Sequence, residues 1–208
     1  MESPPPLSSS RLVTLHDRFT AAWHSETACA PWDLDEFETI VVEQHRMNFE
    51  LWHAEEAARH PEIDDSGLSA VKRRIDRTNQ RRNDLAEDCD AALLARLRSR
   101  NLPNPEAELH SESPGLMIDR LSILSLKLFH TQQEIAQSSG FPPGRAERHR
   151  ERLPILQEQR NDLAVSFDLF WRRVLNGGLR FKIYRQCKMY NDPTLNPEVG
   201  AVQSRTSL

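Results

Sequence analysis

The phrase R-N-D-L-A-x-x-x-D occurs twice in the chain, as Arg82–Asp90 and again as Arg160–Asp168. Around each copy apolar residues recur at steps of three and four, which is the spacing of one face of an α-helix. The arginine of each copy falls on that apolar face, where an uncompensated charge is costly. We therefore expect each arginine to meet a carboxylate or an anionic ligand. The alanine four residues later is expected to let another helix approach closely.

Helices are predicted along most of the chain, because prolines are bunched and the segments between them are rich in Leu, Ala, Glu, Arg and Gln. Capping and termination signals give five helices. The first runs over 12–24, and the second from a cap at Asp33 or Asp35 to about residue 59. The third runs from a cap at Asp65 or Ser66 to a point before Pro103, and the fourth from Pro114, after a Ser113 cap, to about residue 138. The fifth includes residues 153–174, and Pro154 either kinks it or marks its effective start. These lengths favour an all-α fold, a four-helix-bundle-like core with additional N-terminal and C-terminal helical segments.

A chain of 208 residues is expected to form one domain. We predict a disordered N-terminal tail over 1–10, a single helical bundle domain over 11–192 and an extended or disordered C-terminal tail over 193–208. The net charge of −4 argues against a nucleic-acid partner. No apolar run approaches the roughly 20 residues of a membrane helix, and residues 1–10 lack the regions of a signal peptide. A cytoplasmic protein without a membrane span is expected.

Asp119 is the predicted partner of the two arginines. The helix that begins at Pro114 is apolar on two faces, and Asp119 lies on one of them, so its carboxylate should be buried. A buried carboxylate needs a positive partner, and Arg82 and Arg160 are the candidates. Two interpretations stay open: an ion pair that holds helices together, or a polar layer that receives an anionic ligand.

Histidines and carboxylates recur on the second predicted helix, where His45 and Trp52 share one face and His53 and Glu56 share an adjacent one. Such groups occur in metal-binding bundles, but the paired Glu-x-x-His motifs of di-iron bundles are missing, since His53-x-x-Glu56 has the reverse order. We therefore predict no metal and no cofactor. For His45 and Trp52, a hydrogen-bonded core histidine beside a packed indole is the alternative to ligand binding.

The segment 180–191 interleaves basic and aromatic residues. Such a segment can hold phosphate or carboxylate groups by charge-assisted hydrogen bonds while its rings pack or stack. A solvated helix docked by Phe181 and Tyr184 is the alternative, and Asn191-Asp192-Pro193 predicts a turn that ends it. The candidate ligand-binding residues here are Tyr184, Arg185, Lys188, Tyr190, Asn191 and Asp192.

Four motifs follow one another along the chain: H-R-M-N-F-E-L-W-H-A-E-E (45–56), V-K-R-R-I-D-R-T-N-Q-R-R-N-D (71–84), E-S-P-G-L-M-I-D-R-L-S-I-L-S-L-K (112–127) and Y-R-Q-C-K-M-Y-N-D-P-T-L-N-P (184–197). Together they resemble the bacterial domain-of-unknown-function 4254 family over roughly residues 37–200. The resemblance implies a bacterial, all-helical protein whose relatives lie near envelope-glycan glycosyltransferases. It implies no activity, and it adds Asp76 and Arg120 to the candidate site.

Two functions remain. We favour a non-catalytic module that binds an anionic small molecule, a nucleotide-sugar or sugar phosphate, or a partner enzyme such as a glycosyltransferase, with a link to envelope glycan synthesis. The alternative is an enzyme of phosphoester or glycan chemistry, with Asp119 or Glu56 as general base, His45 or His53 as acid and an arginine clamp. A homo-oligomer is left open. The candidate ligand-binding residues are His45, Trp52, His53, Glu56, Asp76, Arg82, Asp119, Arg120, Arg160, Tyr184, Arg185, Lys188, Tyr190, Asn191 and Asp192.

Overall fold

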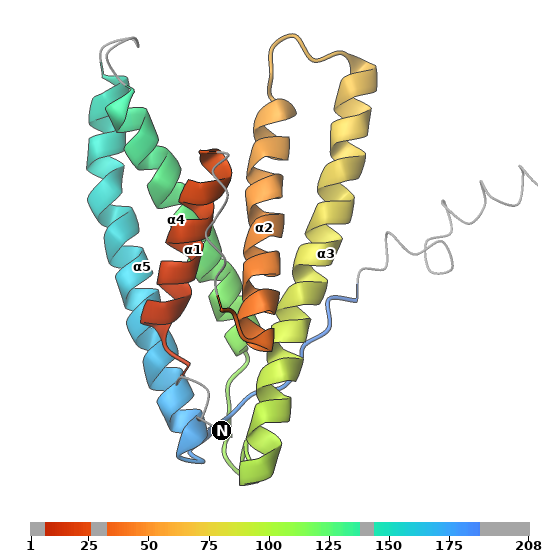
Figure 1. The fold of residues 1–208 in the computed structure, drawn as a ribbon, viewed down its shortest axis with the longest axis vertical. Helices are drawn as coiled ribbons and strands as arrows, with labels where there is room; N and C mark the ends of the chain where they lie inside the picture. The colour runs from red at the N-terminus through yellow and green to blue at the C-terminus, as the bar shows by residue number, and fades with distance from the viewer. Residues whose placement is uncertain (1–6, 26–32, 138–143, 188–208) are drawn as a thin grey trace, which may run out of the picture.

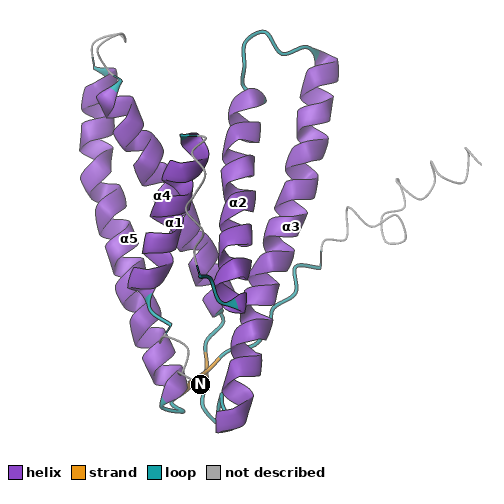
Figure 2. Cartoon of the chain, viewed as in Figure 1, coloured by secondary structure: helices purple, strands orange, loops and turns teal. Residues whose placement is uncertain are grey.

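A computed structural model of the chain describes residues 7–25, 33–137 and 144–187, which form an all-α, bundle-like fold (Figures 1 and 2). The described residues contain five α-helices: α1 (Ser9–His24), α2 (Glu36–Ala57), α3 (Asp65–Leu97), α4 (Pro114–Ala136) and α5 (Arg145–Leu175). A 3-10 turn over Arg98–Arg100 follows α3, and two short strands, β1 (Glu108–Leu109) and β2 (Leu179–Arg180), pair in parallel. None of the described helices is both long and apolar enough to span a membrane.

α4 is the central helix, because it contacts each of the other four helices described. In Figure 1, α2 and α3 form one helical hairpin, α4 and α5 form a second, and α1 lies between the two. The buried core is continuous across the helices, with Leu12, Phe37, Cys89, Ile118 and Phe167 in one cluster. This is the predicted bundle-like core with an additional N-terminal helix.

Side-chain caps set where the helices begin. Ser8, Asp35, Asp64 and Ser113 each accept a hydrogen bond from a backbone N–H in the first turn of the helix that follows. At α2 the cap is reciprocal, since the Glu38 side chain also accepts from the backbone N–H of Asp35. The predicted caps at Asp35 and Ser113 are confirmed, whereas α3 is capped one residue earlier than expected.

Two helix starts differ from the prediction. α1 begins at Ser9, so it includes residues expected in a disordered tail. α5 begins at Arg145 and contains Pro154 in its interior. Pro154 is exposed, so water can solvate the carbonyl that loses its backbone donor, and the helix continues past it. The remaining residues of the two predicted tails, 1–6 and 193–208, lie outside the described residues.

The expected C-terminal helix is absent from the described part of its segment, residues 176–187. The chain turns at Gly177, whose φ of 72° suits glycine, then forms β2 and continues to residue 187 without regular secondary structure. Pairing with β1 competes with a helix here, because Arg180 accepts from His110 N–H at 2.9 Å and donates to the Ala107 carbonyl at 2.8 Å. Phe181 is buried, but it lies in a segment that is not helical.

Candidate functional site

A polar layer crosses the bundle core at Asp119 of α4, which is 5% exposed. Arg82 of α3 donates two hydrogen bonds to its carboxylate, Nε to Oδ1 at 2.8 Å and Nη2 to Oδ2 at 2.6 Å. From α2, Asn48 donates to Oδ1 at 2.9 Å and Gln44 donates to the same oxygen. The hydrogen bond with Asp119 raises the pKa of Arg82 above its ordinary value. One carboxylate thus joins three helices, and the predicted pair of Arg82 with Asp119 is confirmed.

The layer continues to His45 of α2 through Ser122 of α4. His45 Nδ1 lies 2.7 Å from Ser122 Oγ, and Nε2 lies 2.8 Å from Thr20 Oγ1 of α1. Burial of the whole ring lowers the pKa of His45 to about 3, so the imidazole is neutral at pH 7. An indole stacks on it at a centroid distance of 5.2 Å. The geometry is that of a hydrogen-bonded core histidine, but the indole is Trp23 rather than Trp52.

Arg160 does not pair with Asp119, so that part of the prediction was wrong. Its Nη1 lies 2.7 and 2.9 Å from the two carboxylate oxygens of Asp17 on α1, and 3.4 Å from Ser125 Oγ on α4. α5 packs against α4 and α1, so the Arg160 guanidinium meets α1 instead of the Asp119 layer. Asp119 already receives donors from α2 and α3.

The two copies of the repeated phrase nevertheless perform the same structural task. In each copy the arginine pairs with an aspartate of a neighbouring helix, and the last aspartate accepts a backbone N–H at the start of that same helix. Asp90 of α3 accepts from Gly115 N of α4 at 2.7 Å. Asp168 of α5 accepts from Ser9 N and Oγ of α1 at 2.8 and 2.7 Å. Each copy thus fixes a neighbouring helix at two points, with a carboxylate at its positive N-terminal end.

α3 and α4 approach each other backbone to backbone at Gly115. A Cβ atom placed there would lie only 2.1 Å from the carbonyl oxygen of Ala86 and 3.1 Å from Cγ of Asp90. Ala86 is the alanine of the repeated phrase, so the close helix approach predicted for it is confirmed. Asp90 is buried in this contact, and that burial raises the pKa of its carboxyl to about 6.

Two cavities adjoin Arg82. One of about 520 Å³ lies between α2, α3 and α4 and is lined in part by Trp52 and Glu56. The other, of about 300 Å³, brings together three predicted site residues, Arg82, Asp119 and Tyr184. Arg82 is the only cation among the described residues that line this smaller space, which also contains Asp119, Glu87 and Asp90. An excess of carboxylates does not favour an anion there.

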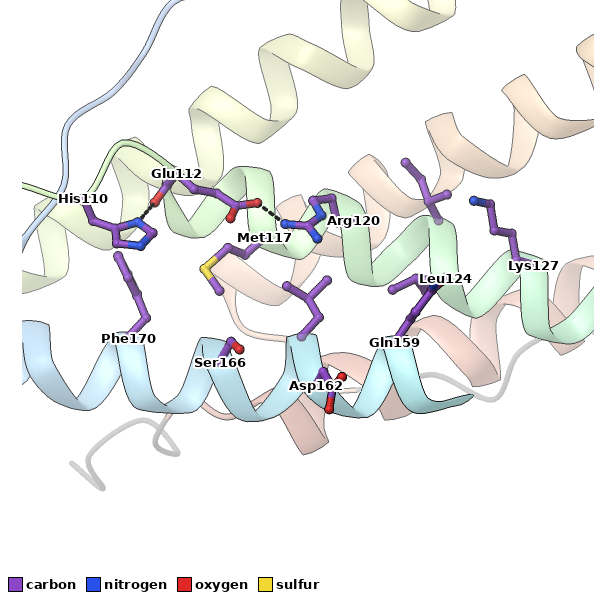
Figure 3. A pocket seen from close by; sticks show the side chains of 12 residues that line it. His110, Glu112, Met117, Arg120, Leu124, Lys127, Gln159, Asp162, Ser166 and Phe170 are labelled. Atoms are coloured by element: carbon purple, nitrogen blue, oxygen red, sulfur yellow. Dashed lines mark hydrogen bonds and ion pairs between the residues drawn. The ribbon is translucent and has the colours of Figure 1, made fainter. Parts of the chain in front are cut away.

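Two further cavities share Lys127 and Gln159 and lie along α4 and α5; we call the pair the α4–α5 groove. Figure 3 shows the larger cavity, of about 790 Å³, with side chains from α4 facing side chains from α5. The smaller cavity has a volume of about 480 Å³. The larger is lined by His110, Glu112, Met117, Arg120, Ile123, Leu124, Asp162, Leu163, Ser166 and Phe170, and the smaller by Trp52, Glu56, His130, Thr131, Glu134, Arg145, His149, Arg152, Ile155 and Leu156.

Two cations of the groove, Lys127 and Arg152, are available to bind an anion. Both are exposed, and neither forms an ion pair with a residue of the described ranges. The other two cations of the groove are paired, Arg120 with Glu112 at 2.6 Å and Arg145 with Glu134 at 2.6 Å. The larger cavity also contains the carboxylate of Asp162.

Three histidines from three helices meet beside the smaller cavity: His24 of α1, His53 of α2 and His130 of α4. One ring nitrogen of each lies within 4.8 Å of those of the other two. His24 Nδ1 lies 2.8 Å from the backbone oxygen of Thr20, and His53 Nδ1 lies 2.9 Å from Oε2 of Glu56. Burial lowers the pKa of His130 to about 4. Sequence reasoning named His53 but missed the other two, because no spacing along the chain relates them.

The other predicted site residues are dispersed. Asp76 is exposed on α3 and lines none of the four cavities described above. Arg185 is exposed, and its Nη1 lies 3.4 Å from Oε2 of Glu87. Lys127 and Arg152 were missed as site residues; Lys127 lies in the mainly apolar stretch L-S-I-L-S-L-K-L-F (121–129), and that position is the signal that could have found it. Lys188, Tyr190, Asn191 and Asp192 lie outside the described residues.

A family model described as "Protein of unknown function (DUF4254)" matches residues 38–183. The matched stretch contains both copies of the repeated phrase and nearly all of α2 through β2, whereas α1 precedes it. No curated protein and no solved structure was found to match the chain.

Proposed function

The chain belongs to the DUF4254 family of proteins of unknown function, so we propose its function from the geometry of its cavities. We propose that the α4–α5 groove binds an anionic small molecule of the nucleotide-sugar or sugar phosphate class. The observation that carries this proposal is Lys127, a cation without a carboxylate partner in the described residues, at the junction of two cavities.

The dimensions and chemistry of the groove support a ligand with a charged centre and two less charged ends. Cavities of about 300–1,000 Å³ are typical for small molecules, and the two halves have about 790 and 480 Å³. Lys127 and Arg152 would hold phosphate oxygens by charge-assisted hydrogen bonds. Asp162 and Ser166 offer hydrogen-bond partners for sugar hydroxyls, and Phe170 offers an apolar surface for a ring.

This location differs from the arginine-centred site predicted from the sequence. Arg82, Arg160 and Arg185 each face a carboxylate, so an incoming anion would have to compete with an existing ion pair. An anion that binds Lys127 and Arg152 has no ion pair with a described residue to displace, so we place the proposed site in the groove. A glycosyltransferase partner, a role in envelope glycan synthesis, a bacterial source and a cytoplasmic location stay predictions.

Isothermal titration calorimetry with UDP-glucose, glucose 1-phosphate, inorganic phosphate and uncharged glucose tests the proposal. We expect the phosphate-bearing sugars to bind and glucose not to bind. Lys127→Ala and Arg152→Ala should each weaken binding by at least about 10-fold, because a hydrogen bond to a charged group contributes about 1.5–3 kcal/mol. Matched controls are Lys72→Ala and Arg172→Ala, which remove exposed cations outside the groove. The proposal is wrong if none of the anions binds, or if the controls weaken binding as much as the groove variants.

A further inference from the structure

We infer that His24, His53 and His130 form a binding site for a divalent transition-metal ion, with Zn²⁺ as the expected occupant. This inference goes beyond the proposed function and does not depend on it, since His130 is the one member of the trio that lines the groove. It departs from the prediction, made from α2 alone, that no metal binds.

The first observation is the convergence of three imidazoles from three helices. The ring centroids lie 5.2 Å apart for His24 and His53, 4.9 Å for His24 and His130, and 5.6 Å for His53 and His130. The ring planes are inclined to one another by 64° to 74°. Zn–N bonds of about 2.0–2.1 Å place the nitrogens of a tetrahedral site roughly 3.3 Å apart. Since one nitrogen of each ring already lies within 4.8 Å of the others, closure by roughly 1.5 Å or less is needed.

The second observation is that hydrogen bonds prepare the rings to act as ligands. A carbonyl oxygen only accepts, so His24 Nδ1 must donate to the Thr20 oxygen, 2.8 Å away, and the lone pair is then on Nε2. A carboxylate likewise accepts, so His53 donates from Nδ1 to Glu56, and Nε2 is left as its ligating nitrogen. Nε2 of His24 and Nε2 of His130 are buried without a hydrogen-bond partner in the described residues. A metal ion would satisfy buried nitrogens of this kind.

The third observation is an ordered outer shell. Glu56 accepts from His53 and also from Trp52 Nε1, at 2.7 Å, so the carboxylate is held in place. The Trp52 indole in turn stacks on His130 at a centroid distance of 4.3 Å, with the two planes only 2° apart. A carboxylate that orients a ligating histidine is the usual outer-shell partner in metal sites. One carboxylate and one indole therefore position two of the three ligands.

The donor set selects the class of ion. Three neutral imidazoles suit Zn²⁺ and its neighbours in the first transition row, whereas Mg²⁺ and Ca²⁺ prefer oxygen ligands. Three protein ligands also leave a fourth position of a tetrahedral ion for water or another small ligand. Phe129 stacks on His24 at 4.3 Å and Phe49 contacts the edge of the same ring at 4.9 Å, so part of the surroundings is apolar.

Calorimetric titration of the full chain, stripped of metal with a chelator, with ZnCl₂ tests the inference. We expect one ion per chain. Loss of an outer-shell partner typically lowers metal affinity roughly 10–100-fold, and we expect a loss of about this size for Glu56→Gln. The loss of Zn²⁺ affinity should be larger for each of the ligand variants, His24→Gln, His53→Gln and His130→Gln. His110→Gln is the matched control: His110 Nδ1 also lies 2.9 Å from a backbone oxygen, but outside the trio. It should bind Zn²⁺ like the unchanged protein.

Histidine side-chain NMR of the unchanged protein gives a second readout that needs no variant to fold. Without metal, His24 and His53 should be protonated at Nδ1, and Zn²⁺ should shift the Nε2 resonances of the trio while those of His110 stay in place. Absence of Zn²⁺ binding, or binding that leaves the trio's resonances and the affinities of its variants unchanged, overturns the inference. The cluster would then be an aromatic contact between helix ends.

Discussion

Replacement of Gly115 by alanine is expected to destabilise the protein, although alanine is the better helix former by about 1 kcal/mol. The added Cβ would lie 2.1 Å from the backbone oxygen of Ala86, an overlap of roughly 1 Å that rotation of a side chain cannot relieve. The first turn of α4 must therefore move away from α3. That movement stretches the 2.7 Å hydrogen bond from Gly115 N to Asp90 and strains the Arg82 pair with Asp119, one turn later.

The magnitude follows from these terms. Overpacking costs about 1–3 kcal/mol and the weakened bond to a charged acceptor about 1.5–3 kcal/mol, whereas the better helix propensity of alanine offsets at most about 1 kcal/mol, so a net loss of about 1.5–5 kcal/mol is expected. For a chain of this size that loss lowers Tm by roughly 3–20 °C. Urea and thermal unfolding, followed by far-UV circular dichroism, measure it.

Gly67→Ala is the matched control. Gly67 also lies in the first turn of a helix, and its N–H also donates to an aspartate, Asp64, at 2.7 Å. The nearest atoms to its added Cβ are side-chain atoms of Asp64 and Ile63, which can move. The atom nearest the added Cβ, Asp64 Oδ1 at 2.9 Å, also caps α3, so part of the helix-propensity gain is offset and Gly67→Ala is expected to change stability by no more than about 1 kcal/mol in either direction. If Gly115→Ala proves as stable as Gly67→Ala, the backbone contact between α3 and α4 is not as close as described and the reasoning fails.

Three further predictions concern the repeated phrase. Arg82→Met should lower the free energy of unfolding in urea by about 3 kcal/mol, because it leaves the buried Asp119 carboxylate without its positive partner. Arg160→Met should lower it by about 1 kcal/mol or less, because its partner Asp17 is 46% exposed. Equal losses would contradict the assignment of a buried pair to Arg82 and an exposed pair to Arg160. Asp90 has a folded-state pKa of about 6, above its ordinary 3.8, so the folded state holds its proton more tightly and stability falls as pH rises between these values. One unit of pKa difference corresponds to about 1.4 kcal/mol, so the free energy of unfolding should fall by up to about 3 kcal/mol. Asp90→Asn should abolish this part of the pH dependence of unfolding. Asp168→Ala removes the acceptor at the start of α1, and it should cost about 1–2 kcal/mol and speed hydrogen exchange in α1 more than in α2.

The helices and one buried pair could be predicted from the sequence because they depend on local patterns. Ser113 followed by Pro114 is a local signal that favours a helix start, and the structure has that start. Arg82 and Asp119 both lie on apolar faces, so burial forces them to find partners of opposite charge. The partner of Arg160 was not predictable, since it depends on which helix packs against α5 at that level, and α1 brings Asp17 there.

The candidate sites required the three-dimensional arrangement. The groove exists because α4 and α5 lie side by side, so Lys127 and Arg152 come together from different helices. The three histidines come together only because the ends of three helices meet, and no sequence pattern relates those helix ends to one another. The segment after Gly177 was predicted as a helix in one interpretation because the spacing of Phe181 and Tyr184 also fits a helix, but the chain there pairs with β1 through β2 instead.

The hydrogen bonds of Ser9 with Asp168 join residues 159 positions apart. At a translation rate of about 5–20 residues per second, roughly 8–30 s separate the synthesis of α1 from that of the carboxylate that accepts its first backbone N–H. During that interval the apolar face of α1, with Leu12 and Leu15 that are buried in the folded chain, lacks its final neighbour and is open to chaperones. The start of α1 is thus expected to gain its Asp168 contact only after most of the bundle has been synthesised, and a nascent chain that ends before residue 168 should leave that start more accessible to proteases.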